Sequence, residues 1–380
     1  MSVPIFDSHL DLAANALMLD RDLSLPLNEL AASERGMTDL RCRAHPTVSF
    51  PELRRADVRF CSATVLARVR AGSRPTTGFA RSEIDYSTGD AAHAMGMAQI
   101  AYYETLARRG ELVMIRTAEE LAAFTADRES ATPASRTASR EPAASVTSPI
   151  GCILSMEGAD PILTPSETGV WWERGLRFAS LVHYGEGQYA GGTGASSGVT
   201  AAGYELLREF ERHGILLDLT HLSEPAFYQA VDAFPGAVLA SHNNCRHLVP
   251  GDRQFSDEQI TIVAERGGVI GVACDAWMLY PGWERGVTMP EVVSLDAVAD
   301  HIDHICEVTG SSGHVAIGSD LDGLYGWEQT PHDLKSIADL QKLTALLERR
   351  GYRPDQIEAI MYRNWVEFFS RYLPANGGYR

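Results

Sequence analysis

Eight short apolar runs recur along the chain and predict β-strands. The runs are continuous rather than alternating, a pattern typical of strands that are covered on both faces. They lie at residues 3–10, 58–68, 151–157, 178–184, 215–221, 237–243, 268–274 and 314–321. The sequence therefore predicts a parallel sheet enclosed by other elements.

Helices are predicted between most of these runs and after the last one. Ser223 and Ser256 stand where N-caps belong, and Gly214, Gly310 and Gly351 follow the expected helix ends. The expected helices cover residues 90–109, 200–213, 223–234, 256–266, 294–309, 333–350 and 355–373.

The order of these elements favours a single α/β domain over residues 1–380, a (β/α)8 TIM-type barrel with extra C-terminal helices. The alternative is an open doubly wound sheet, which usually carries a glycine-rich phosphate turn after its first strand. Here residues 11–14 (DLAA) follow the first run, so the barrel is the better interpretation. Residues 126–149 are rich in Ala, Ser, Thr, Pro and Arg and predict a mobile surface insertion.

Composition and charge narrow the class of protein. The 380 residues are 45% hydrophobic and 22% charged, as in globular enzymes, and the net charge of −17 argues against nucleic acid or an anionic membrane as partner. No signal peptide, lipid-anchor signal or membrane-spanning apolar run is recognisable. The six cysteines are scattered without paired spacing, so we expect no disulfides and a cytoplasmic location.

Residue types that bind metals end or lie within five of the apolar runs. A charge or an imidazole that closes a buried strand is costly unless something binds it. The candidates are His9, Asp11, Glu157, His221, His242 and Asp320. Five such runs predict a metal site at the mouth of the barrel.

The spacing of these candidates suggests two metal ions. His9 and Asp11 lie two apart on the first run, where the strand period would aim both at the barrel interior. His221 and His242 close neighbouring strands and could hold a second ion. Glu157 has two carboxylate oxygens and could bridge the two; pairing with an arginine or capping a helix is the alternative.

Such a centre supports hydrolysis. Two cations about 3.5–4 Å apart lower the pKa of a bridging water and polarise a substrate oxygen. Asp320 could take a proton from the bridging water, which becomes the metal-bridging hydroxide, and return that proton to a leaving amine. His183, which ends the fourth run, could donate to the oxyanion. The residues thus predict metal-assisted hydrolysis of an amide or ester.

The chain resembles the renal or membrane dipeptidases, peptidase family M19, which are zinc enzymes of the amidohydrolase barrel group. The resemblance runs from residues 7–12 (DSHLDL) to Arg363 and Asn364. Its most specific parts are residues 218–223 (DLTHLS), 240–246 (ASHNNCR) and 318–323 (GSDLDG).

The resemblance implies two Zn2+ ions and a dipeptide substrate, including dipeptides with a D-residue at the C-terminal side, and it suggests a homodimer. His9 and Asp11 would bind one zinc, His221 and His242 the other, and Glu157 would bridge them.

Three further roles follow from the resemblance. Asp320 would be the acid/base carboxylate, and His183 would contact the substrate carbonyl or oxyanion. Arg253 stands where the family places an arginine on the substrate carboxylate, and a surface ion pair with Asp252 or Glu258 is the alternative.

Two other functions remain open from the sequence. A deacylase or lactonase of the same barrel group is one, although these relatives often bridge their metals with a modified lysine. A non-catalytic metal-binding barrel is the other, and its hallmark would be a missing ligand or a lost Asp320. The side-chain preference of the substrate is beyond the sequence.

Overall fold

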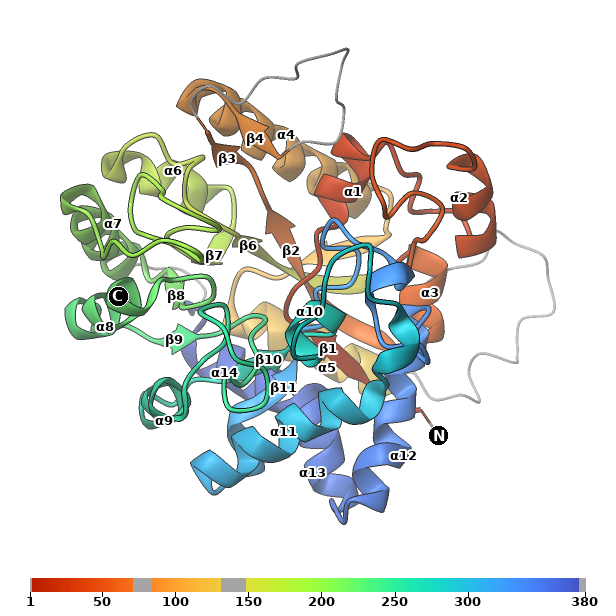
Figure 1. Ribbon diagram of the computed structural model, residues 1–380. Helices are drawn as coiled ribbons and strands as arrows, with labels where there is room; N and C mark the ends of the chain where they lie inside the picture. Colours follow the sequence, from red (N-terminus) through yellow and green to blue (C-terminus); the bar gives the residue numbers. More distant parts are fainter. Residues whose placement is uncertain (1, 71–83, 131–147, 376–380) are drawn as a thin grey trace.

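The computed structural model describes residues 2–70, 84–130 and 148–375. Its central sheet has nine parallel strands, of which eight follow one another in the order β10-β11-β1-β2-β6-β7-β8-β9, while β5 (Leu112–Met114) pairs with β6 beside this order. A parallel bridge between Ala240 and Ile270 joins the two ends of this order and closes the barrel (Figure 1). The eight strands are β1 (Ile5–Asp7), β2 (Val58–Val65), β6 (Ile150–Met156), β7 (Leu176–Ala179), β8 (Leu216–Asp218), β9 (Val238–Leu239), β10 (Ile270–Val272) and β11 (Val315–Ile317). The predicted barrel is confirmed.

Helices follow one another around the outside of the barrel (Figure 1). They include α4 (Gly89–Arg108), α6 (Thr168–Glu173), α7 (Ala201–His213), α8 (Glu224–Ala233), α9 (Asp257–Glu265) and α11 (Leu295–Thr309). The hydroxyls of Ser223 and Ser256 cap α8 and α9, and Gly214 and Gly310 end α7 and α11 in the left-handed conformation. These caps are the ones predicted from the sequence.

The C-terminal helices close the amino ends of the strands. They are α12 (Lys342–Arg349), α13 (Pro354–Glu358), the π-helical turn η6 (Ala359–Arg363) and α14 (Asn364–Tyr372). Phe369 stacks on Phe6 inside the barrel at 5.4 Å between ring centroids, and the Trp365 indole donates a hydrogen bond to the Ile317 carbonyl at 2.9 Å. This aromatic packing leaves the opposite, carboxyl ends of the strands for the functional residues.

Several elements were not predicted from the sequence. They are α1 (Leu12–Met18), α2 (Leu27–Ser33), α3 (Phe50–Arg55), β3 (Arg68–Val69), β4 (Asp85–Tyr86), β5 (Leu112–Met114), α5 (Ala118–Ser130), α10 (Ala276–Leu279) and the 3-10 turns η1 (Pro165–Glu167), η2 (Pro290–Val292), η3 (Ser312–His314) and η4 (Trp327–Gln329). The 3-10 turn η5 (Ile337–Gln341) lies within the helix predicted at 333–350. Of the insertion predicted at 126–149, residues 126–130 belong to α5 and 131–147 lie outside the described residues.

Two predictions about the chain as a whole can be compared with the structure. All six cysteines are free, as expected. Within the described ranges, every helix is too short or too polar to cross a lipid bilayer.

Candidate metal centre and active site

The candidate site residues lie in the loops just beyond the carboxyl ends of the strands. Strand β1 ends at Asp7, so His9 and Asp11 belong to the following loop, where Asp11 precedes helix α1. The prediction that a strand period aims both side chains is therefore wrong, because the strand is shorter than its apolar run. The other candidates follow the ends of β6, β7, β8, β9 and β11: Glu157, His183, His221, His242 and Asp320. Loops at this end of a barrel form its active site.

Two buried carboxylates fix these loops. Asp7 accepts hydrogen bonds from the Ser319 backbone at 2.8 Å and from the Ser319 hydroxyl at 2.5 Å. Asp218 accepts from the backbone N–H groups of Thr220 and Ser241, each at 3.0 Å. Asp218 is thus a buried hydrogen-bonding group. Each carboxylate therefore joins residues that flank the candidate ligands.

The loops also hold non-glycine residues in the left-handed region. His221 has φ 69°, Asp320 has φ 58° and Asp322 has φ 60°. Such a conformation costs on the order of 1–3 kcal/mol per residue and persists only where its surroundings impose it. Asp322 is held by the backbone N–H groups of Thr47 and Val48, at 2.9 and 3.0 Å. Backbone strain is thus concentrated at the candidate site.

Glu157 lies at the centre of the cluster. Its Oε1 is 2.9 Å from His221 Nε2 and 3.2 Å from His242 Nε2. Its Oε2 is 3.6 Å from His9 Nε2, which also lies 3.8 Å from the carboxylates of Asp11 and Asp320. The two oxygens of one carboxylate therefore face two separate groups of possible ligands.

The unpaired atoms of this cluster are those that a cation would use. His9 Nε2 and Asp11 Oδ1 are buried and have no hydrogen-bond partner among the described residues. Three overlapping groups here have ligand atoms within 4.8 Å of one another: His9, Asp11 and Glu157; His9, His242 and Asp320; and Glu157, His183 and His221. Imidazole and carboxylate suit divalent transition metals, so the donor set fits such ions. The grouping of His183 with His221 goes beyond the sequence prediction.

Burial sets the protonation states of the cluster. It lowers the pKa of His221 and of His242 well below the ordinary value, so both rings are neutral, the form that binds metal. It raises the pKa of Glu157 to about 7 and that of Asp320 well above its usual range. For His9 burial acts to lower the pKa, but the charge of Glu157 and the other carboxylates raises it to about 10. Without a metal ion, the cluster therefore supplies too little positive charge to keep Glu157 and Asp320 ionised as readily as free carboxylates.

His183 is fixed by an arginine that the sequence analysis did not identify. Arg68 Nη1 donates to His183 Nδ1 at 3.2 Å, and Asp85 holds Arg68 Nε at 2.7 Å. Because arginine can only donate, Nδ1 must accept, and the neutral ring carries its proton on Nε2. That atom lies 3.5 Å from Glu157 Oε1 and faces the cluster. Burial lowers the pKa of His183 well below its ordinary value, so the ring is neutral.

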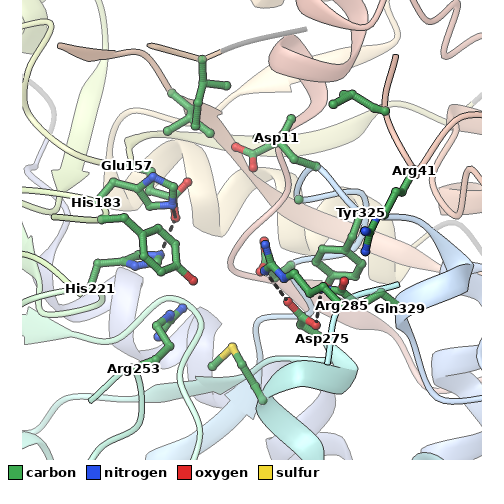
Figure 2. Close-up of a pocket in the computed structure, with 18 of the residues that line it drawn as sticks. Asp11, Arg41, Glu157, His183, His221, Arg253, Asp275, Arg285, Tyr325 and Gln329 are labelled. Carbon is green, nitrogen blue, oxygen red and sulfur yellow. Dashed lines mark hydrogen bonds and ion pairs between the residues drawn. The ribbon is translucent and has the colours of Figure 1, made fainter. Parts of the chain in front are cut away.

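The cluster opens into a cavity of about 620 Å³ (Figure 2). Arg253 lines it and is only 4% exposed. Its guanidinium donates to Asn243 Oδ1 at 2.5 Å and to the His242 carbonyl at 2.8 Å. The surface ion pair with Asp252 or Glu258 that we weighed from the sequence is therefore wrong.

The side of the cavity opposite Arg253 was not foreseen from the sequence. Figure 2 shows Asp275, Arg285, Tyr325, Gln329 and Arg41 on this side. They come from the segments after β10 and β11 and from the long loop before α3, so no local spacing pattern relates them.

One further group of possible ligands lies away from the cavity. His304 on α11 is 2.8 Å from Asp257 and stacks on His247 at 4.7 Å between ring centroids. Helix α11 lies on the outside of the barrel (Figure 1), so this group is separate from the cluster beyond the strand ends.

The chain was compared with protein families and with curated proteins. A family model described as membrane dipeptidase (peptidase family M19) matches residues 1–372. An uncharacterized protein from the pqqA 5′ region of Klebsiella pneumoniae is 30% identical over 198 residues, 52% of this chain and 69% of that protein. An uncharacterized dipeptidase of Schizosaccharomyces pombe is 29% identical over 220 residues, 57% of this chain and 51% of its own length. The aligned region thus spans about half of the yeast relative.

Solved structures share the fold. A metallopeptidase of family M19, dipeptidase AC, superposes with a TM-score of 0.72 at 21% identity and covers 99% of this chain and 100% of its own. A metallopeptidase from Rhodobacter sphaeroides, liganded with a phosphinate mimic of the dipeptide L-Ala-D-Ala, gives 0.71 at 20% identity, with 98% and 100% coverage. The family match extends over nearly the whole sequence and includes every candidate ligand. The chain therefore belongs to the membrane dipeptidase family, peptidase family M19, and is an enzyme of the peptide-bond hydrolase class.

Proposed function

We propose that the protein is a dipeptidase with a binuclear zinc centre bridged by Glu157. The observation that carries the proposal is the position of this carboxylate, with Oε1 facing His221 and His242 and Oε2 facing His9. Asp11 Oδ1, buried without a partner, would complete the group around His9. These five residues are the ligands predicted from the sequence.

Zinc ions bound here would lower the pKa of a shared water and polarise the peptide carbonyl. Asp320 lies beside His9 at 3.8 Å, and burial raises the pKa of its carboxyl. The positive charge of bound cations would lower this pKa again, and the ionised carboxylate could then accept a proton from the attacking water and pass it to the leaving amine. This is the acid/base role predicted for Asp320.

His183 would donate a hydrogen bond to the developing oxyanion. The contact with Arg68 leaves the proton on Nε2, which is the atom that faces the cluster. A donor that is already oriented costs no reorganisation when charge develops on the carbonyl oxygen.

Arg253 would bind the free carboxylate of the dipeptide. It is buried, lines the cavity and is fixed by Asn243 and the His242 carbonyl, so its remaining donors have a defined direction. If Arg253 requires a free carboxylate one residue beyond the reacting peptide bond, dipeptides are favoured over longer chains. The relative bound to an L-Ala-D-Ala mimic supports including dipeptides with a D-residue at the C-terminal side.

The test is a kinetic screen of L-Xaa-L-Xaa and L-Xaa-D-Xaa dipeptides with purified protein whose metal content has been measured. N-acetyl amino acids and lactones belong in the same screen, because they represent the deacylase and lactonase alternative. We expect turnover of dipeptides with a free carboxylate and two zinc ions per chain. Preferred turnover of N-acyl amino acids or lactones would refute the proposal.

A further inference from the structure

The catalytic cavity has a second cationic side. Figure 2 shows Arg253 and Arg285 on opposite sides of the cavity. The guanidinium of Arg285 lies 3.6 Å from the Asp275 carboxylate and 5.5 Å from the centre of the Trp277 ring. Its side chain is nevertheless 57% exposed. Arg285 is thus oriented by two neighbours while its donors stay open to the cavity.

Arg41 adds a second guanidinium to this side. Within the part of the chain that the structure describes, this guanidinium makes no hydrogen bond or ion pair. It packs directly on the backbone of Gly286, where a side-chain carbon would overlap its nitrogen atoms. Gly286 also has φ 73°, a conformation that glycine adopts without strain. A side chain at position 286 would therefore have to displace the Arg41 guanidinium.

The carboxylates on this side already have partners. Asp39 is paired with Arg43 at 2.8 Å, and Asp275 accepts a hydrogen bond from Gln329 at 2.9 Å. Glu328 accepts from a backbone N–H group at 3.0 Å. Asp275 also lies 3.6 Å from Arg285, whereas Arg41 has no ion pair among the described residues. A substrate carboxylate placed between the two guanidinium groups would be attracted by both. The side opposite Arg253 is therefore suited to an anionic group of the substrate.

We infer that the enzyme prefers dipeptides with an acidic side chain on the N-terminal residue. The inference rests on the proposed function, in which Arg253 holds the C-terminal carboxylate. A dipeptide oriented in this way directs its N-terminal residue away from Arg253, toward Arg285 and Arg41. Guanidinium groups bind carboxylates through charge-assisted, paired hydrogen bonds, and the neutral amide of Gln or Asn forms weaker ones.

The experiment compares L-Glu-L-Ala with L-Gln-L-Ala, which have nearly the same shape and differ in charge. We expect kcat/KM of the metal-loaded enzyme to be about tenfold higher for L-Glu-L-Ala, the effect of one charge-assisted hydrogen bond. In Arg285→Gln the ratio of the two kcat/KM values should fall toward one. Arg41→Gln should reduce the ratio in part, and Arg285→Glu should favour L-Lys-L-Ala instead.

Arg212→Gln is the matched control, because Arg212 is 71% exposed on α7 and does not line the cavity. Its Glu/Gln ratio should equal that of the unmodified enzyme. Equal turnover of the two dipeptides, or a preference that survives both Arg285→Gln and Arg41→Gln, would overturn this inference and leave the dipeptidase proposal intact. Failure to hydrolyse any dipeptide would overturn both.

Discussion

The Nε2 atoms of His221 and His242 lie 3.1 Å apart. Each ring has its other nitrogen beside a hydroxyl, Thr193 Oγ1 at 3.2 Å and Ser241 Oγ at 2.9 Å. If each Nδ1 donates its proton to that hydroxyl, both Nε2 lone pairs point into the same space, next to Glu157. Burial lowers the pKa of both rings, so they do not share a bound proton at neutral pH. A cation bound between the two rings and Glu157 would stabilise this arrangement.

Removal of metal should therefore abolish activity and lower stability. We expect a chelator to remove about two ions per chain, and Zn2+ to restore dipeptide turnover. At a free zinc concentration about 100 times Kd, binding should stabilise the fold by about 2.7 kcal/mol. Metal analysis, activity and thermal unfolding of the same samples would measure this. Undiminished turnover in metal-free protein would refute the metal centre.

The stability of the metal-free protein should fall as the pH rises from about 6.5 to 10. In the folded state the pKa of Glu157 is raised to about 7 from 4.5, and that of His9 to about 10 from 6.5. Both groups bind more protons when folded, so their stabilisation is complete below the unfolded values and is lost through the folded ones. The histidines with lowered pKa, among them His183, His221 and His242, are neutral in both states above about pH 6.5 and add little slope there.

Denaturant unfolding of metal-free protein at several pH values would measure this decline. In Glu157→Gln the part of the decline below about pH 8 should be reduced, because the titrating carboxyl is gone. A metal-free protein whose stability rises with pH over this window would contradict the protonation states described above.

Asp320→Asn should impair catalysis and spare metal binding. The amide keeps the shape of the carboxyl but cannot accept and return a proton, so kcat should fall by roughly 10²–10⁴-fold. Zinc content should stay close to that of the unmodified protein. Glu328→Gln, a carboxylate on the far side of the cavity, serves as the control. Near-normal kcat in Asp320→Asn would remove this residue from the reaction.

Arg68→Met should reduce kcat through His183. Without the guanidinium, Nδ1 can take the ring proton, and Nε2 then loses its donor role in part of the molecules. We expect a decrease in kcat of about tenfold with little change in KM, the size of one weakened oxyanion contact. Arg68→Lys, which keeps a donor, should recover part of the loss. A pure increase in KM would indicate a role in substrate binding instead.

Arg253→Ala should weaken dipeptide turnover by more than about tenfold, because the substrate carboxylate loses a charged partner. Bound zinc should remain, since Arg253 contacts the His242 backbone and not its ring. Dipeptide amides, which lack the carboxylate, should be affected far less. Unchanged dipeptide kinetics would exclude this residue from the site.

The sequence was sufficient for the barrel and for most of the cluster, for one physical reason. A strand buried on both faces has a continuous apolar run, and a polar residue at its end, such as Glu157 or His242, needs a partner. The positions at which the strands end were harder to predict. Loops that line a cavity are buried too, so an apolar run continues past the last residue of the strand. His9 and Asp11 lie together, as predicted, but the predicted reason was wrong, because both belong to the loop after β1 and not to the strand.

Contacts between distant segments could not be predicted. Arg68 contacts His183 across 115 positions, and Arg41 meets the backbone of Gly286. Neither pair has a characteristic spacing, because the barrel closure alone brings the segments together. The cationic side of the cavity is for this reason visible only in the structure.

The left-handed backbone at His221, Asp320 and Asp322 constrains how the protein can be improved by engineering. Glycine would relax the backbone at His221 and Asp320, so variants selected for heat tolerance alone should accumulate at these two positions. Such variants would gain stability by discarding a ligand or an acid/base group, whereas glycine at Asp322 would also remove the hydrogen bonds to Thr47 and Val48. A search for a hardier catalyst should therefore leave these loops untouched and look for gains in the outer helices.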